Sequence, residues 1–304
     1  MYWIQLRLPI KMNYLLTMMK MYSSYKRIQS GAVLIFVSSL LFAQSSIIQR
    51  SDQGFIDYEK RVIVGKGVAK IQLSNSEAPS PSDKKIKFAQ GSAKNRARNN
   101  INNLVKQVNY NGIPLGEFMQ YDPTIEKRIS YYVSSAYQNG KVEFIKDGNV
   151  EVAMAISMVG LSEIIFPGVG FAPDKSKSAQ YLMTRSTIPK AQRITGIVID
   201  ARNTSLKPAI APRIVDENGT PIYGMNNSTR GNAINKGLVG YAHTLGSPEL
   251  EKRIGKNPLI VKALNKDYSG KTNPVVSLKS GLEIKAAQKS FDLFAECKVL
   301  VLIN

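Results

Sequence analysis

Apolar and polar positions in the first half of the chain follow two periods, one typical of strands and one typical of helices. Residues 59–73 combine β-branched residues with two glycines and predict a strand. From Asp83 to Val108 apolar residues recur every three or four positions, which predicts a long helix with Ser82 as its N-cap. The predicted apolar face of this helix consists of Ala89, Ala93, Ala97, Ile101, Leu104, Val105 and Val108. Because three of these residues are alanines, we expect the helix to lie close against a sheet.

A second helix and a hairpin are predicted downstream. Asp122-Pro123 places a capping residue and a first-turn proline in their preferred order, and the helix is predicted to stop at Asn139-Gly140. Residues 112–120, between the helices, are predicted to form a short strand. Asp147-Gly148 is a strong hairpin signal. The inward side chains of the hairpin are predicted to be Val142, Phe144, Val150, Val152, Met154, Ile156 and Met158.

The second half of the chain alternates between predicted strands and one predicted helix. The pattern favours a buried strand from Ile194 and a tight turn at Asp216-Glu-Asn-Gly219. Further strands are predicted at residues 258–264, 274–278 and 298–303, with a helix at residues 280–290. Together these patterns predict an α+β protein of two modules, each a small mixed sheet with helices packed on one face.

Domain boundaries follow from composition and length. Residues 161–193 are rich in turn formers and polar residues and predict a linker. We place the first module at residues 58–160 and the second at residues 194–304. The length of 304 residues fits two modest domains, each large enough to bury a core.

The first 43 residues have the layout of a secretory signal peptide. Lys20, Lys26 and Arg27 precede an uncharged run from Gly31 to Ala43, which is shorter than the roughly 20 apolar residues that span a bilayer. We therefore predict cleavage after Ala43 and a periplasmic or outer-membrane-associated protein. An uncleaved membrane anchor is the alternative.

Two features of the leader modify this interpretation. Apolar residues also precede the basic cluster, so translation from Met18, Met19 or Met21 is an alternative start. No cysteine follows the apolar run, and an acylated lipoprotein needs one at that place. We therefore expect a protein that is soluble or held at a membrane only by its surface.

The charge of the chain indicates a polyanionic partner. Removing residues 1–43, which hold five basic and no acidic residues, lowers the formal net charge from +19 to +14. A field of this sign attracts polyanions. Export replaces nucleic acid, the default partner of a basic cytoplasmic protein, with lipid headgroups, acidic glycans or cell-wall polymer. The alternative is that the lysines only solvate the surface.

Composition excludes several chemistries. One histidine, His243, and one cysteine, Cys297, cannot supply a structural zinc site or a redox pair within one chain. We therefore predict no metal and no cofactor, and we expect Cys297 to be a buried free thiol. The pair Gly65/Gly67 lacks the rest of a dinucleotide fingerprint, so a close backbone approach or a bulge is the favoured interpretation.

Four charged residues of the second module form the candidate ligand-binding site. Asp200, Arg202, Arg213 and Asp216 flank two strands that we expect to pair, which would bring the four side chains together. Such a set could hold a carboxylate or a sugar, but a structural ion-pair network is the favoured interpretation. A second candidate surface is the basic set Lys94, Arg96, Arg98 and Lys106 on the long helix, read first as a solvated face and alternatively as a docking strip.

The sequence of the first module resembles a known bacterial family. The elements that carry the resemblance are Gly65-Lys-Gly67-Val-Ala, the alanine-spaced helix, a second helix and the Asp147-Gly148 hairpin. This set is similar to the domain of outer-membrane antigen lipoproteins of the Lpp-twenty type and to the amino-terminal part of the periplasmic flagellar assembly protein T. The resemblance implies a non-enzymatic envelope protein. The chain departs from the lipoproteins in lacking a cysteine near the predicted cut.

We therefore expect an exported, non-enzymatic protein that binds or scaffolds periplasmic, outer-membrane or flagellar components. Its expected partners are envelope or flagellar proteins, with anionic lipid or glycan as further candidates, and nucleic acid is not among them. A periplasmic enzyme acting on cell-wall or glycan substrate is one alternative, with Asp200, Arg202 and His243 in one cleft. A peripheral protein on an anionic membrane surface is another.

Overall fold

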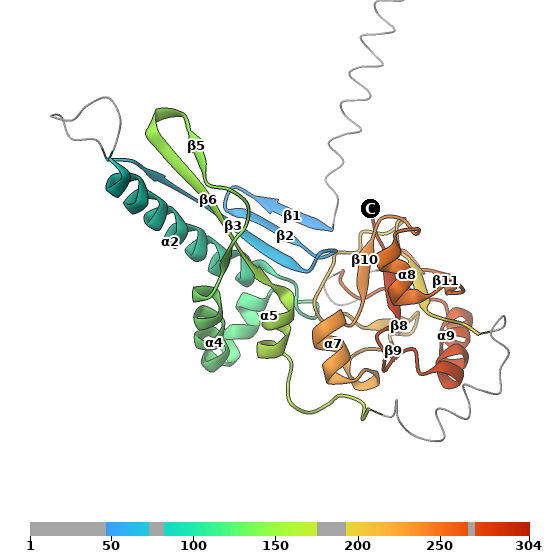
Figure 1. Ribbon diagram of the computed structural model, residues 1–304. Coiled ribbons are helices and arrows are strands. Elements are labelled where there is room, and N and C mark those ends of the chain that lie inside the picture. Colours follow the sequence, from blue (N-terminus) through green and yellow to red (C-terminus); the bar gives the residue numbers. More distant parts are fainter. Residues whose placement is uncertain (1–46, 73–81, 175–192, 267–270) are drawn as a thin grey trace, which may run out of the picture. The chain divides into compact units, whose positions relative to one another are not determined.

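The structure is a computed structural model that describes residues 47–72, 82–174, 193–266 and 271–304. All of them belong to the compact unit Ser46–Asn304 (Figure 1). The predicted leader, its cleavage site and most of the polar part of the predicted linker lie outside the described residues. No helix in the described ranges is long and apolar enough to cross a membrane.

The first module contains an antiparallel sheet with strand order β1-β2-β3-β6-β4, and β5 also pairs with β6. The strands are β1 (Ile48–Ser51), β2 (Gly54–Asp57), β3 (Val62–Lys70), β4 (Tyr137–Gln138), β5 (Glu143–Ile145) and β6 (Asn149–Ser157). The longest pairing joins β3 to β6 from Val62↔Ser157 to Lys70↔Asn149. The predicted hairpin is confirmed, since Asp147 and Gly148 both have positive φ between β5 and β6.

Helix α2 (Asp83–Gln107) covers one face of this sheet, as predicted, and its predicted apolar face is buried. Ser82 is the N-cap by position, although its side chain makes no capping hydrogen bond. A Cβ atom on Gly65 would lie 2.4 Å from the Ala97 carbonyl oxygen. The two glycines of β3 and the alanines of α2 therefore serve a close helix–sheet contact, and the interpretation of Gly65/Gly67 as a close approach is confirmed.

Helices α3 (Leu115–Tyr121), α4 (Pro123–Ser134) and α5 (Met158–Ile165) complete the first module. Asp122 caps α4 by accepting a hydrogen bond from the Thr124 backbone N–H, as the sequence predicts. The predicted strand at residues 112–120 is wrong, because most of that segment forms α3. The predicted start of the linker is also too early, since α5 extends to Ile165.

The second module contains a parallel sheet with strand order β10-β13-β7-β11. Its strands are β7 (Ile197–Asp200), β10 (Gly240–Ala242), β11 (Leu259–Lys262) and β13 (Val299–Leu302). The two central strands β7 and β13 are apolar on both faces and almost wholly buried, which is typical of parallel sheets. Val198 and Leu300 pack against Leu250 and Ile254 of helix α8 (Pro248–Ile254).

A smaller sheet with order β12-β8-β9 lies in the same module. Its strands are β8 (Ile214–Asp216), β9 (Pro221–Tyr223) and β12 (Val275–Val276). Helix α9 (Leu278–Phe291) follows β12, close to the predicted helix, and α7 (Arg230–Lys236) has no counterpart in the sequence prediction. The predicted α+β class is confirmed, and Cys297 is a buried free thiol as expected.

Two arginines join the two modules by donating hydrogen bonds to carbonyl groups at helix ends. Arg230, at the start of α7, donates to the Glu163 carboxylate at 2.9 Å and to carbonyl oxygens at the end of α5. Arg61, between β2 and β3, donates to the carbonyl oxygens of Ile234 at 2.8 Å and Asn235 at 2.6 Å in α7. The last carbonyls of a helix lack intrahelical partners and carry partial negative charge, so they are natural acceptors for guanidinium groups.

Candidate functional site

A basic cleft opens at the amino-terminal end of the parallel sheet. Its volume is about 270 Å³, and it is lined by residues at the end of α7, on α8 and just before β13. The lining side chains are Lys236, Glu249, Lys252, Arg253, Glu296 and Lys298. Four of them are basic and two are acidic, so the cleft has a positive formal charge.

Arg253 forms the fixed part of this cleft. Its guanidinium donates to the carbonyl oxygen of Cys297 at 2.8 Å, to that of Gly237 at 3.3 Å and to that of Lys236. Together with Arg61 it thus serves the carboxyl end of α7. Burial lowers the pKa of Arg253, and burial together with the nearby Arg253 charge lowers the pKa of Arg61 to about 10. Even so, both side chains remain cationic at neutral pH, so Arg253 contributes a positive charge that its hydrogen bonds hold in place.

Three lysine side chains line the cleft beside Arg253. Lys298 forms an ion pair with Glu296 at 2.6 Å, and the Lys236 ammonium donates to the Glu296 carbonyl oxygen at 3.3 Å. Lys252 and Glu249 are carried by α8, whose first turn is capped by Ser247. Lys252 is exposed to solvent. This arrangement suits a carboxylate or another anion, because long lysine side chains can reach a ligand that Arg253 attracts.

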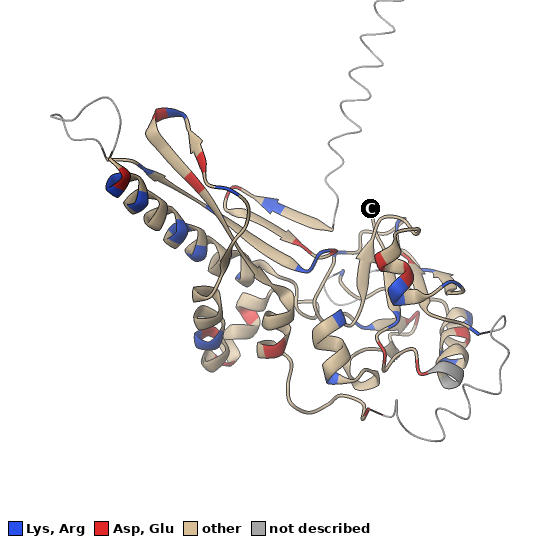
Figure 2. Cartoon of the chain, in the orientation of Figure 1, with Lys and Arg blue, Asp and Glu red and all other residues tan. Residues whose placement is uncertain are grey.

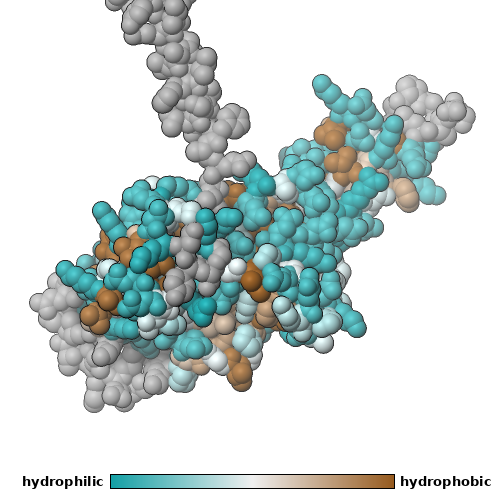
Figure 3. All heavy atoms as spheres, turned by 180° about the vertical axis from the view of Figure 1, so that it is seen from behind, coloured by the Kyte–Doolittle hydropathy of each residue, from teal (hydrophilic) through white to brown (hydrophobic). Residues whose placement is uncertain are grey.

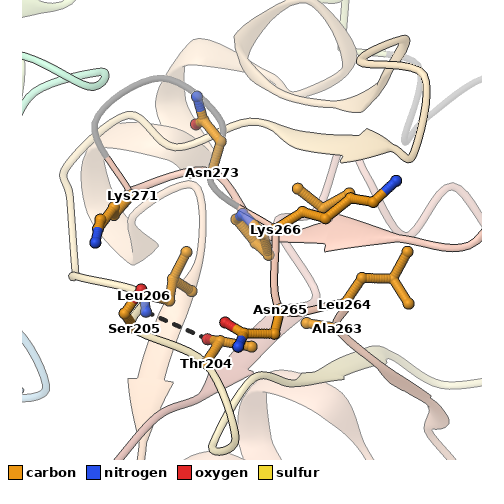
Figure 4. Close-up of a pocket in the computed structure, with 11 residues that line it drawn as sticks. Thr204, Ser205, Leu206, Ala263, Leu264, Asn265, Lys266, Lys271 and Asn273 are labelled. Atoms are coloured by element: carbon orange, nitrogen blue, oxygen red, sulfur yellow. Dashed lines mark hydrogen bonds between the residues drawn. The ribbon is translucent and has the colours of Figure 1, made fainter.

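A second pocket lies near the carboxyl end of β7 and β11, but it is small. Its volume is about 10 Å³, roughly the room that one water molecule needs. Figure 4 shows side chains from three segments around it, with the Leu206 backbone N–H donating to the Thr204 hydroxyl at 3.2 Å. Asn273 is buried there, and its amide nitrogen has no partner among the described residues. The pocket therefore fits a bound water rather than a metabolite.

The structure brings two of the four predicted ligand-binding residues into contact. Asp200 and Arg202 bond to each other, with the guanidinium 2.7 Å from one carboxylate oxygen and 2.9 Å from the other. This bond lowers the pKa of Asp200 and raises that of Arg202. The predicted pairing of the flanking strands is wrong, because β7 and β8 belong to different sheets. Strand pairing therefore does not bring Asp200 close to Asp216.

Asp216 organises the turn between β8 and β9. Its carboxylate accepts hydrogen bonds from the backbone N–H groups of Asn218 at 3.0 Å and Thr220 at 2.8 Å. Burial opposes ionisation of this carboxyl group, but the two backbone donors hold its pKa below the ordinary value. The backbone N–H of Arg213 donates to the Asn273 side chain at 2.7 Å. These contacts fix the local backbone.

His243 lies at the carboxyl end of the parallel sheet, immediately after β10. Its Nδ1 atom is 2.8 Å from the carbonyl oxygen of Ile303. Strand β13 lies between β10 and β7, so the strands that lead to His243 and Asp200 are separated by roughly 10 Å, twice the spacing of neighbouring strands. The sheet therefore does not place His243 beside Asp200.

The four basic residues of α2 point in different directions. At 100° per residue, Lys94 and Arg98 lie on one flank of the buried face, Arg96 lies on the other flank, and Lys106 faces solvent. Arg96 donates to the Val68 carbonyl oxygen at the free edge of β3, and Lys106 pairs with Glu126 at 2.9 Å. The helix therefore does not present these four residues as one strip.

Sequence reasoning missed every residue that lines the basic cleft. Ser247-Pro248 followed by Glu249 is an N-cap, a first-turn proline and an acidic first turn, and this signal could have located α8. Nothing local connects α8 to Lys236 or Lys298, because these residues meet only through the parallel pairing of β10 and β13. In the described residues no group of three or more acidic, cysteine or histidine side chains could hold a metal ion.

One comparison with known proteins concerns the part of the chain that contains the cleft. Residues 196–304 match the family described as the second domain of the Treponema pallidum protein Tp0624. This chain is thus similar to that domain across the second module. No curated protein matches the chain.

Proposed function

We propose that the chain is an exported, non-enzymatic envelope protein that binds an acidic segment of an envelope or flagellar partner in the basic cleft. The observation that carries this proposal is the cleft of about 270 Å³ with Arg253 fixed in its wall and three lysines around it. The leader-like first 43 residues and the resemblance of the first module to envelope proteins support the compartment.

The chemistry of the cleft favours carboxylate groups as ligands. Arg253 donates its hydrogen bonds to backbone carbonyl groups, so it acts on a ligand mainly through its charge. Lys252 and Lys236 carry flexible ammonium groups that can contact an anion directly. Glu249 and Glu296 would repel an anion that bound out of position, which favours one orientation of an acidic peptide.

Titration with a fluorescent peptide of six glutamates tests the proposal. We expect the purified full chain to bind this peptide more weakly as salt rises, because the attraction is electrostatic. Lys252→Glu should weaken binding by roughly 10-fold or more, since it adds a like charge beside the ligand. Lys279→Glu is the matched control, since Lys279 is also an exposed helical lysine, on α9.

Equal affinity of the two variants would overturn the assignment of the cleft. The envelope location has a separate test, mass spectrometry of the protein recovered from its native cells. A mature chain beginning at Gln44 supports export, whereas an intact cytosolic chain that still carries its leader contradicts it.

A further inference from the structure

One end of the first module combines apolar and basic side chains. The β5–β6 hairpin tip lies there, and the Ile71 backbone N–H donates to the Gly148 carbonyl oxygen at 2.8 Å. Helix α2 runs antiparallel to β3, because Gly67 approaches Ala93 and Gly65 approaches Ala97. The start of α2 therefore lies at the same end as the hairpin tip (Figure 1).

Large apolar side chains are exposed at this end. Phe144 is 61% exposed and Ile145 is 40% exposed, and both belong to β5. Phe88, on the second turn of α2, is 70% exposed, and Val68 on β3 is 36% exposed. Phe144 was predicted to point inward, and that prediction is wrong. In Figure 3 brown side chains lie among teal ones at this end.

Lysines surround these apolar side chains. Lys70 of β3 and Ile145 of β5 lie on either side of Asn149 of β6, since both pair with that residue. Lys146 is in the hairpin tip, and Lys84 and Lys87 are in the first turns of α2 (Figure 2). All four are exposed. Among the described residues, no carboxylate forms an ion pair with any of them.

The acidic groups at this end are fewer. They are Asp83 at the start of α2, Asp147 in the hairpin tip, Glu143 at the start of β5 and Glu151, which pairs with Glu143 in the register. Lys85 also lies on the first turn of α2, and Lys66 forms an ion pair with Glu151 at 2.9 Å. Six lysines therefore stand against four carboxylates, and the local charge is positive.

We propose that this end of the protein docks on an anionic lipid bilayer. Apolar side chains that project from a narrow tip can enter the headgroup region, whereas lysines beside them contact lipid phosphates. Each lysine near an anionic surface strengthens attachment by about a factor of five. A lipid surface fits this end better than a protein groove does, because Phe144 and Ile145 are neighbours on β5 and point to opposite faces of the hairpin.

This site is independent of the cleft proposed above. The hairpin and α2 belong to the first module, whereas every residue that lines the cleft belongs to the second. Failure of one proposal would not affect the other.

Sedimentation of the purified full chain with vesicles tests the lipid proposal. We expect more binding to vesicles of phosphatidylcholine with phosphatidylglycerol than to phosphatidylcholine alone. The double variant Lys70→Ala/Lys146→Ala should lose roughly 30-fold in partitioning to the anionic vesicles, at about fivefold per lysine. The matched control is Lys207→Ala/Lys279→Ala, which removes two exposed lysines of the second module. Equal losses in the two double variants would overturn the proposal.

A tryptophan probe tests insertion at the hairpin itself. The only native tryptophan is Trp3. We expect the emission of Phe144→Trp to shift to the blue when anionic vesicles are added, and that of Tyr131→Trp, at an 83% exposed site on α4, to stay unchanged. The leader is common to both variants, so a difference between them reports on the hairpin. An unshifted Phe144→Trp spectrum, with protein bound to the vesicles, would contradict docking through this end.

Discussion

Gly67 of β3 lies so close to Ala93 of α2 that a Cβ atom on the glycine would be 2.0 Å from the alanine carbonyl oxygen. The contact places backbone against backbone, so no flexible side chain can move aside. It explains why the helix face is built from alanines at four-residue spacing. The longest helix of the first module depends on this contact for its packing on the sheet.

Gly67→Ala should therefore destabilise the protein by about 1–3 kcal/mol or more, because the added methyl group forces α2 away from β3. Gly91→Ala is the control, since Gly91 lies on α2 and has open space around it. We expect that change to stabilise the protein by about 0.5–1 kcal/mol through helix propensity. Urea unfolding of the two variants measures both effects, and a neutral Gly67→Ala would refute the close packing.

Arg61→Ala should destabilise the protein by about 1–3 kcal/mol, because the carbonyl oxygens of Ile234 and Asn235 lose their donors. Arg61 also has a φ of 54°, in the left-handed region. Arg61→Gly removes the same donors without the steric cost of a Cβ atom, so it should be about 1 kcal/mol more stable than Arg61→Ala. Thermal unfolding of the two variants separates the loss of the hydrogen-bond donors from the backbone strain. Equal stability of both variants would contradict backbone strain at this site.

Stability should fall in alkali because buried tyrosines resist ionisation. Burial raises the pKa of Tyr58 and Tyr241, whose ring centroids are 6.2 Å apart. A phenol with a raised pKa in the folded state contributes stability below its ordinary pKa of about 10, and this is lost as pH rises above that value. Arg61 and Arg253 have the opposite effect, because burial lowers the pKa of each, but they are two groups against several buried phenols. Denaturant unfolding at rising pH measures the decline.

The control for the alkaline prediction is the double variant Tyr58→Phe/Tyr241→Phe. It should lose less stability than the wild type between neutral pH and pH values above the ordinary phenol pKa. An equally steep decline in both proteins would assign the effect to other groups, of which buried Tyr223 is the first candidate.

The ion pair of Asp200 and Arg202 predicts a shifted titration in acid. Arg202→Gln should raise the pKa of Asp200 towards its ordinary value, because the hydrogen bonds from the guanidinium are the largest cause of the depression. A carboxyl group with a depressed pKa contributes stability above its ordinary pKa and loses it as pH falls. The variant should therefore lose less stability than the wild type on acidification.

Carboxyl carbon NMR measures the Asp200 titration directly. Lys262→Gln is the matched control, since Lys262 lowers the pKa of Asp200 only through its charge. We expect a smaller rise in that variant. A rise as large as that of Arg202→Gln would show that charge alone, without the hydrogen bonds, sets the pKa.

Local sequence determined the elements whose signals are complete within a few residues. The 3.6-residue period defined α2, Asp122-Pro123 defined the start of α4, and Asp147-Gly148 defined the hairpin. Each signal depends on side-chain direction or on a turn conformation, and neither requires knowledge of distant residues. The α+β class follows from these elements alone.

The tertiary structure decided which strands pair and which side chains meet. Strands β7 and β8 look alike in sequence but enter different sheets, because pairing is a long-range choice that no local period encodes. Phe144 follows the inward period of β5, yet β5 lies on the far side of β6 from β3, and the side chain stays exposed. Lys236, Arg253 and Lys298 form one cleft only because parallel strands bring their amino-terminal ends to the same edge of a sheet.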